Sequence, residues 1–349
     1  MNFRIVLNLT SSIIFMTGLA MLVCIIPAYI MNDPSHVIIG FLKIALFTLL
    51  TAAYLFYKTR GEGKIGFRES FGVVVLVWLS VSVFGSLPFV WIQKMSWADA
   101  FFETMSGFTT TGASILDEIE SLPYSLNFWR SFSNWLGGMG IVVLGMVILP
   151  ILGIGGMQMY KAESTGPISE QLTSRVASTA KSLWLVYLGL TIVLIFLLHF
   201  AGMEWFYSIC HAFSAMSTGG FSPKNDSISS YSYTIQLIMS TFMFISGINF
   251  ILHFKALRGN IKSYKEDEEC RFYFKVIVVS IVVITSNLLF TGTLNNAMEA
   301  FTLATFQVAT FITCAGFSST NFDTWPALSK GFLISLMLVG SCGALHVVV

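Results

Sequence analysis

Residues 97–114 read WADAFFETMSGFTTTGAS, a short apolar stretch followed by small polar residues and a glycine. The apolar part, residues 97–108, is too short to cross a bilayer as a helix, which takes about 20 residues. A short apolar helix between two longer spans is typical of a segment that enters the membrane and returns to the same side. We therefore expect a re-entrant pore helix at 97–108 and a loop at membrane depth after it.

The same pattern occurs twice more, after residues 205–216 (WFYSICHAFSAM) and after about 298–312. When Gly112, Gly220 and Gly316 are aligned, Ser or Thr occurs in all three repeats at three further positions. Two residues after the glycine these are Ser114, Ser222 and Ser318. Three residues before it they are Thr109, Ser217 and Thr313, and six residues before it Ser106, Ser214 and Thr310. The chain therefore contains an internal repeat of helix, re-entrant loop and helix.

The composition of these loops suits a filter for a monovalent cation. Such an ion must exchange its water shell for other oxygens, and backbone carbonyls supply them without adding charge that would trap the ion. Aiming several consecutive carbonyls at one axis requires unusual backbone angles, which glycine adopts at low cost. Thr and Ser add hydroxyl oxygens, and the pore helix directs its negative C-terminal end toward the cation.

The overall composition excludes soluble, disordered and nucleic-acid-binding classes. Hydrophobic residues make up 55% of the 349 positions and charged residues only 11%, and the mean hydropathy is +0.77. A soluble globule cannot bury that much apolar surface, and a disordered chain would not hold 32 Phe. The net charge of +1 favours no nucleic-acid partner, and the five scattered cysteines form no zinc or disulfide pattern.

Eight apolar runs are long enough to span a membrane, which predicts an all-α polytopic membrane protein. They cover about 5–31, 37–57, 71–92, 132–157, 183–203, 233–252, 272–290 and 331–349. With the N-terminus in the cytoplasm, 14 of the 19 Lys and Arg residues fall inside and four fall outside. Ten Asp and Glu residues lie in the same outer connections as the four outer Lys and Arg residues, so the outer face would carry a net charge of −6. Such a charge would concentrate cations at a pore mouth. The alternative is that it reflects only the avoidance of Lys and Arg on the outer side.

Several stretches resemble the Trk/Ktr/HKT superfamily of potassium transporters, and specifically its Trk-type membrane subunit. They are 106–114 (SGFTTTGAS), 129–163 (WRSFSNWLGGMGIVVLGMVILPILGIGGMQMYKAE), 214–222 (SAMSTGGFS) and 313–326 (TCAGFSSTNFDTWP). The resemblance implies repeats of outer helix, pore helix with filter, and inner helix around a pseudo-fourfold pore. It divides the chain into two N-terminal helices (1–60) and pore repeats at 67–165, 181–260 and 270–349.

By this resemblance, backbone carbonyls of the three filter segments would bind the ion. These are the carbonyls of Thr110, Thr111, Gly112, Thr218, Gly219, Gly220, Cys314, Ala315 and Gly316. The family usually has Thr at the position of Cys314. Cys at this position keeps the backbone carbonyl as a ligand but lacks the side-chain hydroxyl of Thr. In the family, glycine at the position of Gly112 goes with potassium preference and serine with sodium permeability.

A gate below the filter is also implied, in a glycine- and serine-rich break of the third inner helix. Gly340, Ser341, Cys342 and Gly343 begin such a segment, and the pattern then stops at residues 345–349 (LHVVV). No sequence matches a fourth repeat, so we expect the third to be cut within its inner helix or gate loop. A filter with three of four walls is expected not to conduct selectively by itself.

The resemblance implies potassium transport across the bacterial inner (plasma) membrane by a multi-pass homodimer. It also implies a separate cytosolic nucleotide-binding regulatory subunit. The cytoplasmic loops of this chain hold no P-loop or GxGxxG motif, so we expect no nucleotide site in the chain itself. Potassium is the transported substrate, and no cofactor is indicated. Coupling to a second ion, as in a symporter, is left open.

Two other functions compete with this reading. A secondary transporter of another monovalent cation or a small solute would show inverted repeats and charges in broken helices, but Lys43 is the only clear mid-span charge and lies outside the repeats. A membrane enzyme would need convergent His, Asp, Glu or Cys groups, and the sequence offers no such set.

Overall fold

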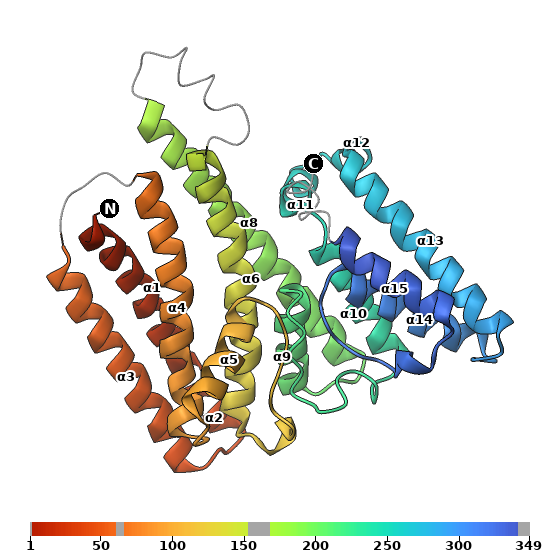
Figure 1. Ribbon diagram of the computed structural model, residues 1–349, viewed down its shortest axis with the longest axis horizontal. Helices are drawn as coiled ribbons and strands as arrows, with labels where there is room; N and C mark the ends of the chain where they lie inside the picture. The colour runs from red at the N-terminus through yellow and green to blue at the C-terminus, as the bar shows by residue number, and fades with distance from the viewer. Residues whose placement is uncertain (1, 61–65, 153–167, 341–349) are drawn as a thin grey trace. The chain divides into compact units, whose positions relative to one another are not determined.

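The computed structural model describes residues 2–60, 66–152 and 168–340, which form helices and short connections without any strand (Figure 1). The chain divides into two compact units, residues 1–109 with 114–181 and residues 110–113 with 182–349. Among the described residues, five helical stretches are long and apolar enough to cross a membrane: Phe3–Ile30, Ser35–Lys58, Phe71–Trp91, Ala180–Phe200 and Glu268–Phe290. The predicted all-α, multi-span fold class is therefore confirmed.

The first unit is a helical layer in which small residues allow close packing. It contains α1 (Phe3–Val23), α2 (Ile25–Ile30), α3 (Ser35–Lys58), α4 (Phe67–Trp91), α5 (Trp97–Phe108), the 3-10 turn η1 (Ile119–Ser121) and α6 (Tyr124–Leu152). Helix α1 packs against α3 and α4, and α5 packs against α4 and α6. A Cβ added at Gly18 would lie 2.8 Å from the Leu49 Cγ atom, so glycine lets α1 approach α3.

Helix α6 begins at Tyr124, eight residues before the span expected from about residue 132. Its first N–H groups have no partner within the helix, as at any helix start. The buried Asp33 carboxylate supplies two acceptors, at 3.0 Å from the Tyr124 nitrogen and 2.9 Å from the Ser125 nitrogen. A side chain 91 positions earlier thus caps the helix, which no local pattern indicates.

The second unit is organised around α14. Helix α8 (Ile168–Phe200) belongs to this unit from residue 182 onward. The other elements of the unit are α9 (Trp205–Met216), α10 (Tyr233–Ser246), α11 (Phe250–Leu257), α12 (Ser263–Glu266), α13 (Glu268–Phe290), α14 (Ala297–Ile312), the 3-10 turn η2 (Phe322–Thr324) and α15 (Ala327–Val339). Helix α14 packs against α10, α13 and α15.

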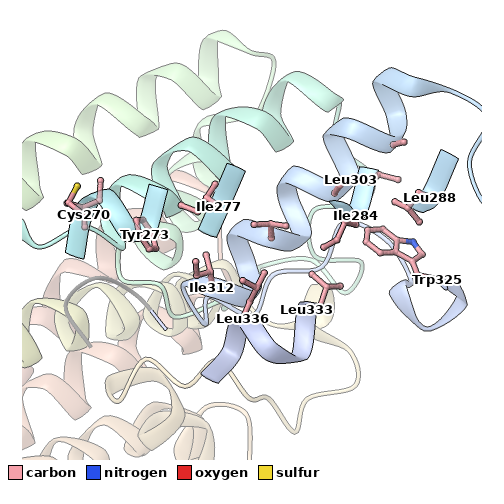
Figure 2. Packing of buried hydrophobic residues seen from close by; sticks show 14 of the residues in the cluster. Cys270, Tyr273, Ile277, Ile284, Leu288, Leu303, Ile312, Trp325, Leu333 and Leu336 are labelled. Atoms are coloured by element: carbon pink, nitrogen blue, oxygen red, sulfur yellow. The ribbon is translucent and has the colours of Figure 1, made fainter. Parts of the chain in front are cut away.

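Apolar side chains from α13, α14 and α15 form the core of this unit, which Figure 2 shows from close by. Tyr273, Ile284 and Leu288 of α13 are fully buried, and Leu303 and Ile312 of α14, Trp325, and Leu333 and Leu336 of α15 belong to the same cluster. Lipid tails are as apolar as these side chains, so van der Waals packing between the helices stabilises the cluster, and not the removal of apolar surface from water. This packing holds α14 in place although it is too short to span a bilayer.

The prediction of one continuous span over 233–252 is wrong. The segment is broken into α10 and α11, which are bent by 95° at Gly247–Asn249. A Cβ at Gly247 would overlap the Tyr273 hydroxyl of α13 and lie 3.0 Å from Thr313 Cγ2. The Asn249 side chain accepts a hydrogen bond from the Ile251 nitrogen at 3.0 Å and so caps α11 as a new helix.

The break exposes carbonyl groups at the end of α10, and two side chains satisfy them. The Tyr273 hydroxyl donates to the Phe244 carbonyl at 3.4 Å, and His253 Nε2 lies 2.9 Å from the Ile245 carbonyl. His253 Nδ1 lies 2.7 Å from the Tyr264 hydroxyl, so the phenol donates to Nδ1 while Nε2–H donates to the carbonyl. Burial raises the pKa of Tyr264, which keeps this phenol protonated.

Candidate functional site

Three loop segments of the second unit share one unusual backbone geometry. Gly112, Gly220 and Gly316 have φ angles of +75°, +74° and +79°, and Thr110, Thr218 and Cys314 have φ angles of +54°, +51° and +54°. The residue between each pair, at 111, 219 or 315, has no positive φ. The register deduced from the sequence therefore corresponds to a repeated conformation, residue by residue.

The left-handed Thr and Cys residues follow from the way the short helices end. After α9, the Gly219 nitrogen donates to the Ser214 carbonyl at 2.9 Å and the Thr218 nitrogen to the Ala215 carbonyl at 3.1 Å. After α14, the nitrogens of Ala315 and Cys314 donate equivalently to Thr310 and Phe311. This is the Schellman ending of a helix, whose left-handed residue is usually glycine. Thr and Cys there cost about 1–3 kcal/mol each, a strain that is concentrated at functional sites.

The structure brings the three segments together. Residues Thr110–Ala113 belong to the second unit with 218–220 and 314–316. A Cβ at Gly112 would overlap the Gly219 carbonyl oxygen, and a Cβ at Gly220 would overlap the Ala315 carbonyl oxygen. The first segment therefore lies against the second, and the second lies against the third. At Gly316 an added Cβ meets no atom within 4 Å, so its positive φ alone favours glycine there.

The short helices expected at 97–108 and 205–216 are present with those bounds as α5 and α9, and the third is α14. Each ends at the residue before its loop, so its carbonyl end faces the left-handed segment. Hydroxyls at one equivalent position, those of Ser106, Ser214 and Thr310, are buried without a hydrogen-bond partner. They occupy the same position in each short helix, two residues before its last residue.

Sequence reasoning missed a buried charged pair in the first unit. Glu103 of α5 and Arg130 of α6 are 1% and 2% exposed, and Arg130 Nε lies 2.7 Å from Glu103 Oε1. The Ser114 hydroxyl donates to Glu103 Oε1 at 3.0 Å. A carboxylate inside a short apolar helix was the available signal, because buried charges require a partner.

Of the gate residues expected from the sequence, only Gly340 is described. It follows α15 with a φ of +68°, and its nitrogen donates to the Leu336 carbonyl at 3.1 Å. Helix α15 begins at Ala327 and ends at Val339, so the span expected over 331–349 starts four residues earlier. Ser341, Cys342 and Gly343 lie outside the described residues.

Comparison with known proteins assigns the family. Residues 37–346 match the family model TrkH, described as cation transport protein. The Trk system potassium uptake protein TrkH of Escherichia coli K12 is 37% identical over 348 residues, which cover 98% of this chain and 72% of that protein. The TrkG protein of the same organism is 32% identical, over 97% of this chain and 70% of its own length.

A similar solved structure supports the same family. The crystal structure of the potassium transporter TrkH from Vibrio parahaemolyticus aligns with a TM-score of 0.87 at 34% identity, over 98% of this chain and 71% of that one. The resemblance to the Trk-type superfamily inferred from the loop motifs is thereby confirmed. The chain belongs to the TrkH family of cation transport proteins.

Proposed function

We propose that this protein transports potassium across a bacterial inner membrane through a filter lined by backbone carbonyls. The relatives described above are named as potassium uptake proteins, which supports potassium as the substrate here. The protein acts by conducting an ion and not by catalysing a reaction.

One observation carries this proposal. Three segments with the same alternation of positive and non-positive φ lie side by side in one compact unit, each after a short apolar helix. Such backbone can present consecutive carbonyls toward one axis, and carbonyl rings replace the hydration shell of potassium. The ligands would be the carbonyls of Thr110, Thr111, Gly112, Thr218, Gly219, Gly220, Cys314, Ala315 and Gly316.

The surroundings of the segments suit a monovalent cation. The C-terminal ends of α5, α9 and α14 each contribute about half a negative charge without any fixed anion. None of the nine segment residues is ionised, so the ion is attracted weakly enough to leave. Irregular backbone of this kind is tolerated at membrane depth where it lines a water-filled path.

The remaining features of the proposal concern organisation. Residues 1–60 form two leading helices, and 67–165, 181–260 and 270–349 are successive pore repeats. Gly340, Ser341, Cys342 and Gly343 begin a gate, and the N-terminus lies in the cytoplasm. The protein works as a homodimer with a cytosolic nucleotide-binding regulatory subunit, for which the mixed-charge loop 253–271 offers a docking surface on the cytoplasmic side.

Uptake measurements test the proposal. In a bacterial host that lacks its own potassium uptake systems, expression of the complete gene should restore growth at low potassium and raise the initial rate of potassium uptake. Sodium should compete weakly. Uptake of sodium or an organic solute with no potassium uptake would instead support a secondary transporter and contradict the proposed filter.

A further inference from the structure

Each short helix carries a polar residue nine positions before its segment glycine. These residues are Glu103, His211 and Gln307, and they are 1%, 0% and 1% exposed. Most other buried side chains of α5, α9 and α14 are apolar or small. Equivalent burial in three repeats indicates a shared position within the short helices, although the three side chains differ in chemistry.

In the first repeat, Glu103 holds the chain just after the segment. Its carboxylate accepts from the Ser114 hydroxyl at 3.0 and 3.1 Å and from the Ile115 nitrogen at 3.2 Å. Arg130 Nη2 also donates to the Ser114 hydroxyl, at 3.2 Å. Ser114 follows Gly112 by two residues, so the ion pair and α6 together anchor the outer end of the first segment.

In the second repeat, His211 makes the equivalent contact without charge. Its Nδ1 lies 2.8 Å from the Tyr207 carbonyl, which requires a proton on Nδ1. Nε2 of the neutral ring is then an acceptor, and the Ser222 hydroxyl lies 3.2 Å from it. Ser222 follows Gly220 by two residues, as Ser114 follows Gly112.

The third repeat is held differently. Gln307 Nε2 is buried and has no hydrogen-bond partner. Ser318, the residue equivalent to Ser114 and Ser222, is bracketed by the second repeat: its nitrogen donates to the Ser227 hydroxyl at 3.1 Å, and its carbonyl accepts from the Ile228 nitrogen at 3.1 Å. The third segment is therefore anchored by its neighbour, and the first two by their own pore helices.

We propose that Glu103, with Arg130, and His211 are positioning residues that set the cation selectivity of the filter by holding Ser114 and Ser222. This inference rests on the proposed function. A buried ion pair adds little net stability compared with apolar packing, so its geometric role is the better account of its presence. The pair fixes the spacing of the first segment, and a filter that relaxes by a fraction of an ångström accommodates sodium more easily.

The test introduces each substitution into the complete gene and compares initial potassium and sodium uptake rates at matched protein levels in the membrane. Glu103→Gln keeps the shape but leaves Arg130 without its counter-charge, and we expect the potassium-to-sodium ratio to fall about tenfold. Ser114→Ala removes only the anchored hydroxyl of an exposed residue, and we expect a fall of about threefold. This second variant keeps the test decisive if Glu103→Gln does not reach the membrane.

Two control variants have matched positions. Gln307→Leu changes the equivalent residue whose amide nitrogen has no partner, and Asp117→Asn removes an exposed carboxylate three residues beyond Ser114. Both should keep the ratio of the unsubstituted protein. A selective unsubstituted protein whose ratio survives both Glu103→Gln and Ser114→Ala would overturn the inference. An unsubstituted protein that takes up no potassium would overturn the proposed function itself, and the inference with it.

Discussion

Gly112 shows how one residue combines two independent constraints. Its φ of +75° is readily adopted by glycine and rarely by other residues, and a Cβ there would overlap the carbonyl oxygen of Gly219. Gly316 has the same φ but faces no atom within 4 Å. A side chain at Gly112 must therefore displace a proposed ligand of the neighbouring segment, in addition to straining its own backbone.

We predict that Gly112→Ser lowers the ratio of potassium to sodium uptake by at least about tenfold, since moving the Gly219 carbonyl alters the oxygen spacing offered to the ion. Isotope uptake in the potassium-deficient host measures it. Gly189→Ser is the matched control, because Gly189 lies in α8 with no atom within 4 Å of an added Cβ. An unchanged ratio in an active Gly112→Ser protein would count against a role for Gly112 in the filter.

At the scale of an element, the start of α6 depends on a residue from a distant connection. Asp33 accepts hydrogen bonds from the nitrogens of Tyr124 and Ser125, at 3.0 and 2.9 Å. A carboxylate at a helix N-terminus satisfies unpaired N–H groups and complements the positive end of the helix dipole. The bond also ties the connection between α2 and α3 to the helix that carries Arg130.

Asp33→Ala should therefore lower the free energy of unfolding by about 1–2 kcal/mol, and Asp33→Asn, which keeps one acceptor oxygen, by roughly half of that. Thermal unfolding in detergent, followed by circular dichroism, provides the measurement. Asp117→Ala, which removes an exposed carboxylate, should leave the midpoint unchanged. Equal midpoints for Asp33→Ala and Asp117→Ala would show that the cap contributes nothing.

At the scale of the whole molecule, the distribution of charge predicts the orientation in the membrane. Lys and Arg are concentrated in the connections assigned to the cytoplasm, and the outer connections are acidic. We therefore expect the loops that follow α5, α9 and α14 on the outer side of the membrane and the segment 253–271 on the inner side.

Cysteine labelling tests this orientation. Ser230→Cys and Thr293→Cys should react with a membrane-impermeant maleimide in intact cells, whereas Asn260→Cys should react only after the cells are opened. All three positions are exposed. The unsubstituted protein gives the background, which includes the exposed Cys314. Labelling of Asn260→Cys in intact cells would reverse the proposed topology.

The repeat and the short helices can be predicted from local patterns in the sequence. Residues 97–108 and 205–216 are apolar runs that end at small polar residues, and α5 and α9 have those bounds. The register of Gly112, Gly220 and Gly316 could be deduced because a local demand for positive φ selects glycine at each site. These features depend on neighbours within one turn or loop, so a linear pattern contains them.

The remaining features could not be predicted, because they depend on residues that are far apart in the chain and meet only after folding. The break after α10 requires Tyr273 of α13 against Gly247, and the start of α6 requires Asp33. Glu103 could be read as an unusual carboxylate, but its pairing with Arg130 depends on how α5 packs against α6. A buried polar group must find its partner in space, and the sequence states the need for that partner without naming it.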